Sequence, residues 1–233
     1  MKVSAIAIVV VAAFLAAGTA NLEAAVWNLA ADWSDTANPN GVWSLKKNAT
    51  NLFTTNLPDY YGDGSNQAAW ADEPFGWNAH VPFWMLDNED GTVQVHGAEL
   101  DRTGSDYTAA CWTSPIAGDI VISGSVWNTW MSGRTMQWQL LVNDVIVSQG
   151  ELYGNGVYDD DNPFLLGGGS GGAAALMQTV GVGDTVELGL RSISQSGNLG
   201  DWVGVDFQIV PEPATMALLG LGAFGLVMRR RKK

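Results

Sequence analysis

The feature that most limits the fold of this chain is a period-two alternation of apolar and polar residues between positions 26 and 210. In the run MQWQLLV (residues 136–142), apolar positions share one face and the two glutamines share the other. Residues 184–191 and 203–209 alternate in the same way, and no stretch of this region shows a sustained helical period with caps. A strand with one buried face has this pattern. About ten such strands, separated by Gly, Asn and Asp turns, predict an all-β fold, an antiparallel jelly-roll β-sandwich, with a closed barrel as the alternative.

Residues 1–25 have the composition of a secretory signal peptide. Lys2 supplies a charged start, an apolar core runs from Val3 to Ala17, and small residues follow. The apolar core is short and is interrupted by Gly18 and Asn21, which argues against a membrane-spanning helix. The segment therefore predicts export across the cytoplasmic membrane.

The C-terminal residues 211–233 contain three elements in a fixed order. The tripeptide Pro211, Glu212 and Pro213 is expected to be extended and accessible, because proline fixes φ and disfavours helix in the preceding residue. An uncharged apolar stretch, residues 214–228, comes next, and the chain closes with five cations: Arg229, Arg230, Arg231, Lys232 and Lys233. Such cations stay on the cytoplasmic side. The apolar stretch has 15 residues, fewer than the roughly 20 of a single span. We expect a short transmembrane sorting helix that inserts transiently.

This order of elements, in the run PEPATMALLGLGAFGLVMRRRKK, resembles the PEP-CTERM sorting domain of Gram-negative bacteria. The resemblance implies that an exosortase, a membrane-embedded cysteine transpeptidase, recognises the tail and processes it at the tripeptide. It also implies a location at the cell surface, in the outer envelope or in the extracellular matrix of a bacterium that makes exopolysaccharide. A plain C-terminal membrane anchor with a chance Pro-Glu-Pro sequence is the alternative.

Residues 26–210, between the two end signals, are predicted to form one strongly acidic domain. They include 22 Asp and Glu but only five Lys and Arg, a net charge of −17. Nucleic acids and anionic lipid surfaces require positive charge on their partner, so the composition argues against both as ligands of this domain. Cys111 is the only cysteine, which excludes an intramolecular disulfide and predicts a buried, small apolar residue.

The domain itself resembles the sandwich domains of other exported PEP-CTERM proteins, which are similar in build to carbohydrate-binding jelly rolls. The resemblance lies within residues 90–210, in the runs WTSPIAGDIVISGSV, LLVNDVIVSQG, VGVGDTVELGL and DWVGVDFQIV. The chain departs from the pattern at Asp144, where the hairpin usually has Gly, and at Gly97, where Pro commonly follows the His. The resemblance implies the sandwich fold and no particular activity.

Motifs for catalysis do not occur in the sequence. It contains no HExxH or CxxC pattern for zinc and no Gly-x-Ser-x-Gly elbow. The many carboxylates form pairs by chance, so they do not identify a glycosidase. His96, at the end of an alternating strand, is predicted to be a structural hydrogen-bonding residue. The glycine run 167–172 predicts a flexible loop, because neither a Lys-Ser/Thr pair nor a helix follows it as in a phosphate-binding loop. We expect a protein that is not an enzyme.

Calcium is the cofactor that the composition favours, because this ion binds six to eight carboxylate and carbonyl oxygens. The candidate ligands are Asp201 and Asp206, at the last predicted strand, and Asp159 and Asp161, in an acidic loop. Jelly-roll carbohydrate modules often hold a structural calcium, which places Asp201 and Asp206 first. A solvated acidic loop is the alternative for each group.

Eleven tryptophans are the second unusual feature of the chain, because aromatic rings stack on the apolar faces of sugars. Trp112 and Trp138 lie in predicted strands and are expected in the core. The candidates for glycan stacking lie in loops or at strand ends, and they are Trp130, Trp127, Trp77, Trp84, Tyr60 and Tyr61. Packing of these rings onto the sandwich is the alternative.

These features together predict an exported, exosortase-sorted surface or matrix protein with a non-catalytic β-sandwich that binds polysaccharide. The alternatives are a purely structural component of a biofilm matrix, without a ligand site, and a polysaccharide-degrading enzyme. The predicted partners are the exosortase, an extracellular polysaccharide and, transiently, the membrane.

Overall fold

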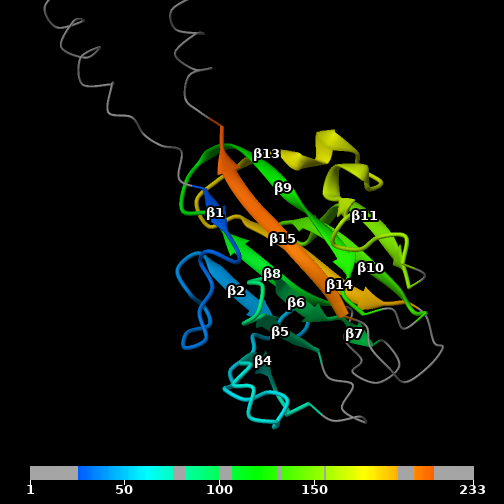
Figure 1. The fold of residues 1–233 in the computed structure, drawn as a ribbon. Helices are drawn as coiled ribbons and strands as arrows, with labels where there is room; N and C mark the ends of the chain where they lie inside the picture. Colours follow the sequence, from blue (N-terminus) through cyan, green and yellow to red (C-terminus); the bar gives the residue numbers. More distant parts are fainter. Residues whose placement is uncertain are drawn as a thin grey trace, which may run out of the picture. The chain divides into compact units, whose positions relative to one another are not determined.

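Two β-sheets form the framework of the part of the chain that the structure describes (Figure 1). The computed structural model describes residues 26–75, 82–99, 107–130, 133–154, 156–193 and 202–212. These residues belong to one compact unit, Val26–Glu212. The predictions for residues 1–25, Trp77, Asp201 and residues 213–233 lie outside the described residues. In the part of the chain that is described, no helix is both long enough and apolar enough to cross a membrane.

The larger sheet has nine strands among the described residues. Across the sheet their order is β12 (Phe164–Leu165), β9 (Gly118–Asn128), β15 (Trp202–Pro211), β6 (Val93–His96), β5 (Phe83–Leu86), β4 (Ala69–Ala71) and β3 (Asn56–Leu57). The two remaining strands are β1 (Trp27–Asn28), which pairs with β15, and β13 (Met177–Val180), which pairs with β9. The long strand β15, drawn in orange in Figure 1, therefore lies inside the sheet and not at its edge.

In the part of the chain that the structure describes, the smaller sheet has six strands. Their order is β11 (Val145–Tyr153), β10 (Thr135–Val142), β14 (Thr185–Ser192), β8 (Thr108–Thr113) and β2 (Trp43–Lys46), and β7 (Ala98–Glu99) pairs with β14.

The chain crosses between the sheets in the pattern of a jelly roll. The strands β6, β8, β9 and β10 alternate between the sheets, β10 and β11 form a hairpin, and β13, β14 and β15 alternate again. The resulting orders are β6-β15-β9-β13 in one sheet and β8-β14-β10-β11 in the other. Among the described strands, only β7 and β14 pair in parallel. This topology confirms the predicted antiparallel jelly-roll sandwich, and it excludes the closed barrel.

The inward faces of the two sheets form the main hydrophobic core. Trp112 and Trp138 are both 0% exposed, as the alternation predicts. Cys111 is a buried free cysteine, which confirms the prediction for this residue. A second, smaller cluster lies on the outer face of the larger sheet, where Tyr60, Phe83 and Met85 pack under the chain segment that joins β3 to β4.

The hairpin between β10 and β11 turns at Asn143 and Asp144, as predicted. Their φ angles are 49° and 63°. Positive φ at both central residues defines a type I′ turn, which Asn and Asp accept more readily than other residues with a Cβ atom. The turn therefore forms although the usual Gly is replaced by Asp144.

The glycine run 167–172 is folded against the smaller sheet, so the prediction of a flexible loop is wrong. It joins two short 3₁₀ helices, η1 (Leu166–Gly168) and η2 (Ala173–Leu176). The backbone N–H of Ser170 donates to the carbonyl of Gln149 in β11 at 2.8 Å. A Cβ atom at Gly169 would lie 2.3 Å from Cη2 of Trp138. The glycines are needed here because the chain passes close to a core tryptophan.

Candidate functional site

The outer face of the larger sheet presents a row of alternating residues on β15. Val203, Val205, Phe207 and Ile209 face the core and are at most 3% exposed. The intervening residues Trp202, Gly204, Asp206 and Gln208 therefore face outward. The register places Gly204 opposite Trp127 of β9 on one side and opposite Gln94 of β6 on the other.

Trp127 lies with its ring across β15. A Cβ atom at Gly204 would be 2.3 Å from Cε2 and 2.5 Å from Nε1 of Trp127, so only glycine lets the indole approach the strand so closely. The side chain of Trp127 is half-exposed. One face of the indole is therefore packed on the sheet, and the arrangement leaves the remainder of the ring at the surface.

Further aromatic rings lie next to this position, around Trp202. Trp202 lies two residues before Gly204 on the same face, a diagonal neighbour of Trp127 at about 7–8 Å between backbones. The ring of Tyr61 stacks on Trp202 with centroids 5.9 Å apart and an interplanar angle of 20°. The ring of Trp130 lies 6.3 Å from it, and Trp130 is 59% exposed. We call Trp127, Trp130, Trp202 and Tyr61 the aromatic surface.

A buried and a partly buried aromatic ring support the aromatic surface from one side. Phe83 and Phe75 meet Trp202 edge-on, with centroids 5.3 and 6.3 Å away. His96 lies opposite Trp202 in the register and is only 7% exposed. Its Nδ1 is 3.2 Å from the carbonyl oxygen of Gly97, which agrees with the predicted structural role. Because packed neighbours hold the Trp202 ring, its orientation is set before any ligand arrives.

Polar side chains lie beside the aromatic rings on the same sheet face. Asp206 is half-exposed, and its Oδ1 accepts a hydrogen bond from Nε2 of Gln208 at 3.0 Å. Ser125 lies opposite Asp206 in the register. Gln94 donates from Nε2 to Oδ2 of Asp87 at 2.8 Å. The face thus combines flat aromatic rings with amide, hydroxyl and carboxylate groups.

Two of the predicted stacking residues are buried, so the prediction is wrong for them. Trp84 is 0% exposed because it occupies the inward position of β5, where its Nε1 donates to Oγ1 of Thr108 at 2.9 Å. Tyr60 is 2% exposed and packs on Phe83 at 4.7 Å between centroids. Burial also raises the pKa of Tyr60 above the usual value. A ring without solvent exposure cannot stack on a sugar.

Sequence reasoning missed Trp202 and Gly204. A usable signal was present, because the alternation that places Val203 and Val205 inward also places both of these residues outward. The pairing of Gly204 with Trp127 could not be predicted in this way, because alternation tells which side chains share a face but not which strand lies beside which.

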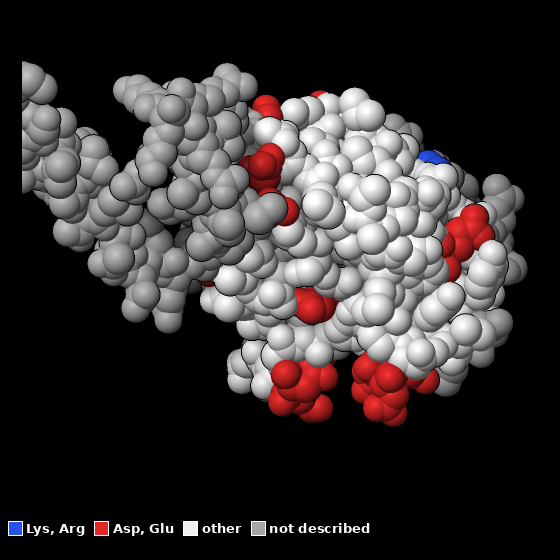
Figure 2. Space-filling view, turned by 90° about the horizontal axis from the view of Figure 1, so that it is seen from above, with Lys and Arg blue, Asp and Glu red and all other residues white. Residues whose placement is uncertain are grey.

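The carboxylates predicted to bind calcium do not form a cluster in the described residues. Asp159 is used locally, because its Oδ1 accepts the backbone N–H of Asn162 at 2.9 Å. Among the residues that the structure describes, no three His, Cys, Asp or Glu side chains lie close enough to hold a metal ion. On the face drawn in Figure 2, acidic side chains gather at separate places. Calcium binding at Asp206, Asp159 or Asp161 stays a prediction.

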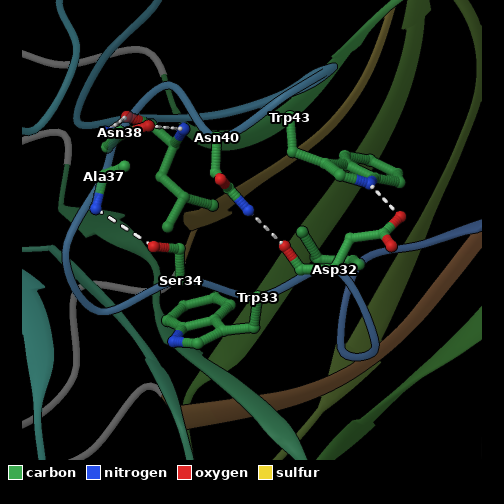
Figure 3. Close-up of a pocket in the computed structure, with 9 residues that line it drawn as sticks. Asp32, Trp33, Ser34, Ala37, Asn38, Asn40 and Trp43 are labelled. Carbon is green, nitrogen blue, oxygen red and sulfur yellow. Dashed lines mark hydrogen bonds between the residues drawn. The ribbon is translucent and has the colours of Figure 1, made fainter.

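A small pocket beneath the N-terminal segment has a structural role (Figure 3). It has room for about one water molecule. The carboxylate of Asp32 accepts a hydrogen bond from Nε1 of Trp43 at 3.0 Å, and its carbonyl accepts one from Nδ2 of Asn40 at 2.8 Å. These bonds attach the N-terminal segment to β2, and the pocket is too small for a sugar.

A buried charged group lies on the outer face of the smaller sheet, and sequence reasoning did not anticipate it. Glu187 of β14 is 0% exposed, forms an ion pair with Lys46 of β2 and accepts a hydrogen bond from the Tyr107 hydroxyl at 3.4 Å. Burial, the largest single effect, lowers the pKa of Lys46, but the hydrogen bond to Glu187 and the attraction of nearby negative charges together outweigh it, and the pKa is raised overall. Burial, with the nearby Glu187 charge, raises the pKa of the Cys111 thiol to about 11. The thiol is therefore protonated at neutral pH and is a poor nucleophile.

The described residues thus define a jelly-roll β-sandwich with an aromatic surface on one sheet. Residues 210–232 match the family described as the PEP-CTERM protein-sorting motif, so the chain carries the sorting signal of an exported, membrane-transiting protein that an exosortase directs to the cell surface. No curated protein matches the chain. Among solved structures the chain is similar to the C-terminal CBM6 of LamC from Zobellia galactanivorans, with 11% identity and a TM-score of 0.32 over 72% of this chain and 98% of that one. A likeness this distant carries no argument about a ligand.

Proposed function

We propose that this exported protein is non-catalytic and binds polysaccharide through the aromatic surface. The observation that carries the proposal is the ring of Trp127, which lies across β15 over Gly204 and is only partly buried. A pyranose presents an apolar C–H face of about the size of one indole, and an aromatic ring held against a sheet at the surface is a suitable platform for it. Trp130, at 59% exposure, extends the platform beyond the end of β9.

The partial exposure of the neighbouring rings also supports this function. Large aromatic side chains are usually covered in a folded monomer, and a contiguous exposed group of them marks an interaction surface. Trp202 and Tyr61 are only partly buried although they have packing partners, and Trp130 beside Trp202 is 59% exposed. Hydrogen-bonding groups such as Asp206 and Gln208 lie close by, as recognition of sugar hydroxyls requires.

The absence of catalytic motifs from the sequence supports the non-catalytic part of the proposal. The carboxylate with the most unusual environment, Glu187, belongs to the other sheet and is sealed from solvent by Lys46 and Tyr107. A glycan cannot reach it without unfolding that face. Release of reducing ends from any polysaccharide that the protein binds would contradict this part of the proposal.

Affinity electrophoresis tests the binding function. Residues 26–212, which form one compact unit, are run through gels that contain neutral polysaccharides or the exopolysaccharide of the producing strain. We expect retardation of the wild type and loss of retardation in Trp127→Ala and Trp130→Ala, with melting temperatures that change little. Trp33→Ala is the matched control, because Trp33 is also half-exposed but belongs to the N-terminal segment. A wild type that no glycan retards, or variants that bind as well as the wild type, would refute the proposal.

A structural matrix component without a ligand site is the second candidate function. The exposed apolar residues Leu165 and Met177, at 64% and 61% exposure, favour it, because such side chains also serve contacts between copies of a protein. Sedimentation of the purified unit over a range of concentrations tests this candidate. Self-association that Leu165→Ser and Met177→Ser abolish, together with no glycan retardation, would favour it over polysaccharide binding.

A further inference from the structure

The described strands on and beside which the aromatic surface lies contain no Lys or Arg side chain. The sequences of β5, β6, β9 and β15 include no Lys or Arg, whereas β15 contributes the half-exposed Asp206 to the outer face. Asp206 lies two residues from Gly204 along the strand, a separation of about 7 Å. A sugar ring over Trp127 therefore has a carboxylate within reach of its substituents.

The described cations are all engaged elsewhere. Lys46 pairs with Glu187, and Lys47 pairs with Asp72 at 2.9 Å. On the smaller sheet, Nε of Arg191 donates to Oε1 of Gln137 at 2.8 Å. Arg134 is the fourth, and it is only 5% exposed. A uronate, sulfate or phosphate group on a glycan would find no counter-charge among these side chains.

We infer that the polysaccharide bound at the aromatic surface lacks acidic groups, and that Asp206 is a specificity-determining residue that repels acidic glycans. This inference rests on the proposed function. The carboxylate accepts hydrogen bonds from sugar hydroxyls or an ammonium group, whereas a second carboxylate at the same place is repelled. The net charge of −17 adds a repulsion that salt screens beyond about 8 Å.

A pair of polymers with one backbone tests the inference. The backbone is a neutral glucan that retards the wild type, and its partner is the carboxymethylated derivative of equal chain length. At low salt we expect the derivative to bind about tenfold more weakly, and the difference should shrink as salt is added. Equal binding of the derivative, lost in Trp127→Ala, would overturn the inference and leave the proposed function intact. Failure of every backbone to retard the wild type would instead refute the proposed function.

A charge reversal distinguishes a local effect of Asp206 from the total charge of the protein. Asp206→Lys is expected to bind the carboxymethylated derivative at least as well as the neutral glucan. Glu151→Lys is the matched control, since it makes the same change of charge on β11 of the smaller sheet. If Glu151→Lys gains as much affinity as Asp206→Lys, then Asp206 does not determine the specificity.

A separate observation concerns the sorting motif, which begins inside the last strand of the sandwich. The sequence predicts an accessible tripeptide, but Pro211 lies opposite Ile120 of β9, and the backbone N–H of Glu212 donates to the carbonyl of Asp119 at 2.9 Å. Both residues are half-buried. Pro211 is extended, as predicted, but it belongs to the sheet and not to a free linker.

We propose that the end of β15 must separate from β9 before the exosortase processes the tail. Enzymes that act on a peptide backbone commonly bind it as an added strand, which requires free N–H and C=O groups. In the folded sandwich the N–H of Glu212 is occupied by Asp119. Only Pro213 separates Glu212 from the apolar stretch that begins at residue 214, so the chain offers no spacer that would expose the motif.

A spacer insertion tests this second proposal in cells that contain the exosortase. Four residues, Gly-Ser-Gly-Ser, are inserted between Val210 and Pro211, and processing is followed by pulse labelling. We expect processing to be several times faster than in the wild type. The same insertion in the turn between Asn143 and Asp144, far along the chain from β15, is the control and should not accelerate it. Unchanged or slower processing with the spacer at Pro211 would overturn the proposal.

Discussion

Replacing Glu187 by alanine removes a carboxylate that is 0% exposed and leaves the ammonium group of Lys46, a side chain only 16% exposed, without its partner. Breaking a buried ion pair from one side costs about 3–5 kcal/mol, because the remaining charge stays desolvated. Domains of this kind have a total stability of about 5–15 kcal/mol. For a domain of this size each kcal/mol shifts the melting temperature by about 2–4 °C, so we expect a fall of about 6–20 °C.

A double-mutant cycle measures whether the coupling to Lys46 is the cause. Urea unfolding is followed for Glu187→Met, Lys46→Met and the double variant, in which two apolar side chains replace the pair. We expect the double variant to be more stable than the sum of the single effects predicts, by about 1–3 kcal/mol. Additivity within about 0.5 kcal/mol would refute the reasoning. Lys47→Met is the control, because its partner Asp72 is 41% exposed and such pairs contribute at most about 1 kcal/mol.

Four further predictions concern packing, pH, the aromatic surface and calcium. Gly169→Ala places a Cβ atom 2.3 Å from Cη2 of Trp138, and urea unfolding should show a loss of about 1–3 kcal/mol; an unchanged midpoint would mean that the glycine run does not pack as described. Burial raises the pKa of Cys111 from 9.0 to about 11, so the stabilisation that the neutral thiol provides is complete below pH 9 and is lost as the pH rises to 11. Over this range the free energy of unfolding, obtained from melting curves, should fall by about 2–3 kcal/mol less in Cys111→Ala than in the wild type. Gly204→Ala should displace the ring of Trp127, because the added Cβ would lie 2.3 Å from Cε2, and affinity electrophoresis should show weaker retardation although every aromatic residue is retained. Added calcium should raise the melting temperature if a structural site exists, and a melting temperature that is the same in calcium and in chelator would contradict that prediction.

The strands could be predicted from the sequence because alternation is a local property. The runs around residues 136–142, 184–191 and 203–209 become β10, β14 and β15. The hairpin at Asn143 could be predicted for the same reason, since a two-residue turn depends on the φ preferences of its own residues. The packing of the glycine run 167–172 could not be predicted, because its composition resembles that of a linker. The glycines let the chain approach Trp138, which lies far away in the sequence.

The aromatic candidates were separated correctly only in part. Trp127 and Trp130 lie at the surface, but Trp84 belongs to the core. Its four-residue strand, Phe83–Leu86, is too short and too uniformly apolar for alternation to tell which side chain faces inward. Trp202 could have been found, since it precedes a regular alternation. Tyr61 and Trp130 were candidates from the sequence, but their packing against Trp202 could not be predicted.

The sequence by itself determined the sorting motif at residues 210–232 and the class of the fold, because both depend on the order of residues along a short stretch of chain. Only the tertiary structure decided that β9 lies beside β15, which places Trp127 over Gly204 and holds Glu212 against Asp119. Alternation states which side chains share a face, but strand partners are chosen by the packing of the whole sandwich. The candidate binding surface and the embedded sorting motif both arise from that single pairing.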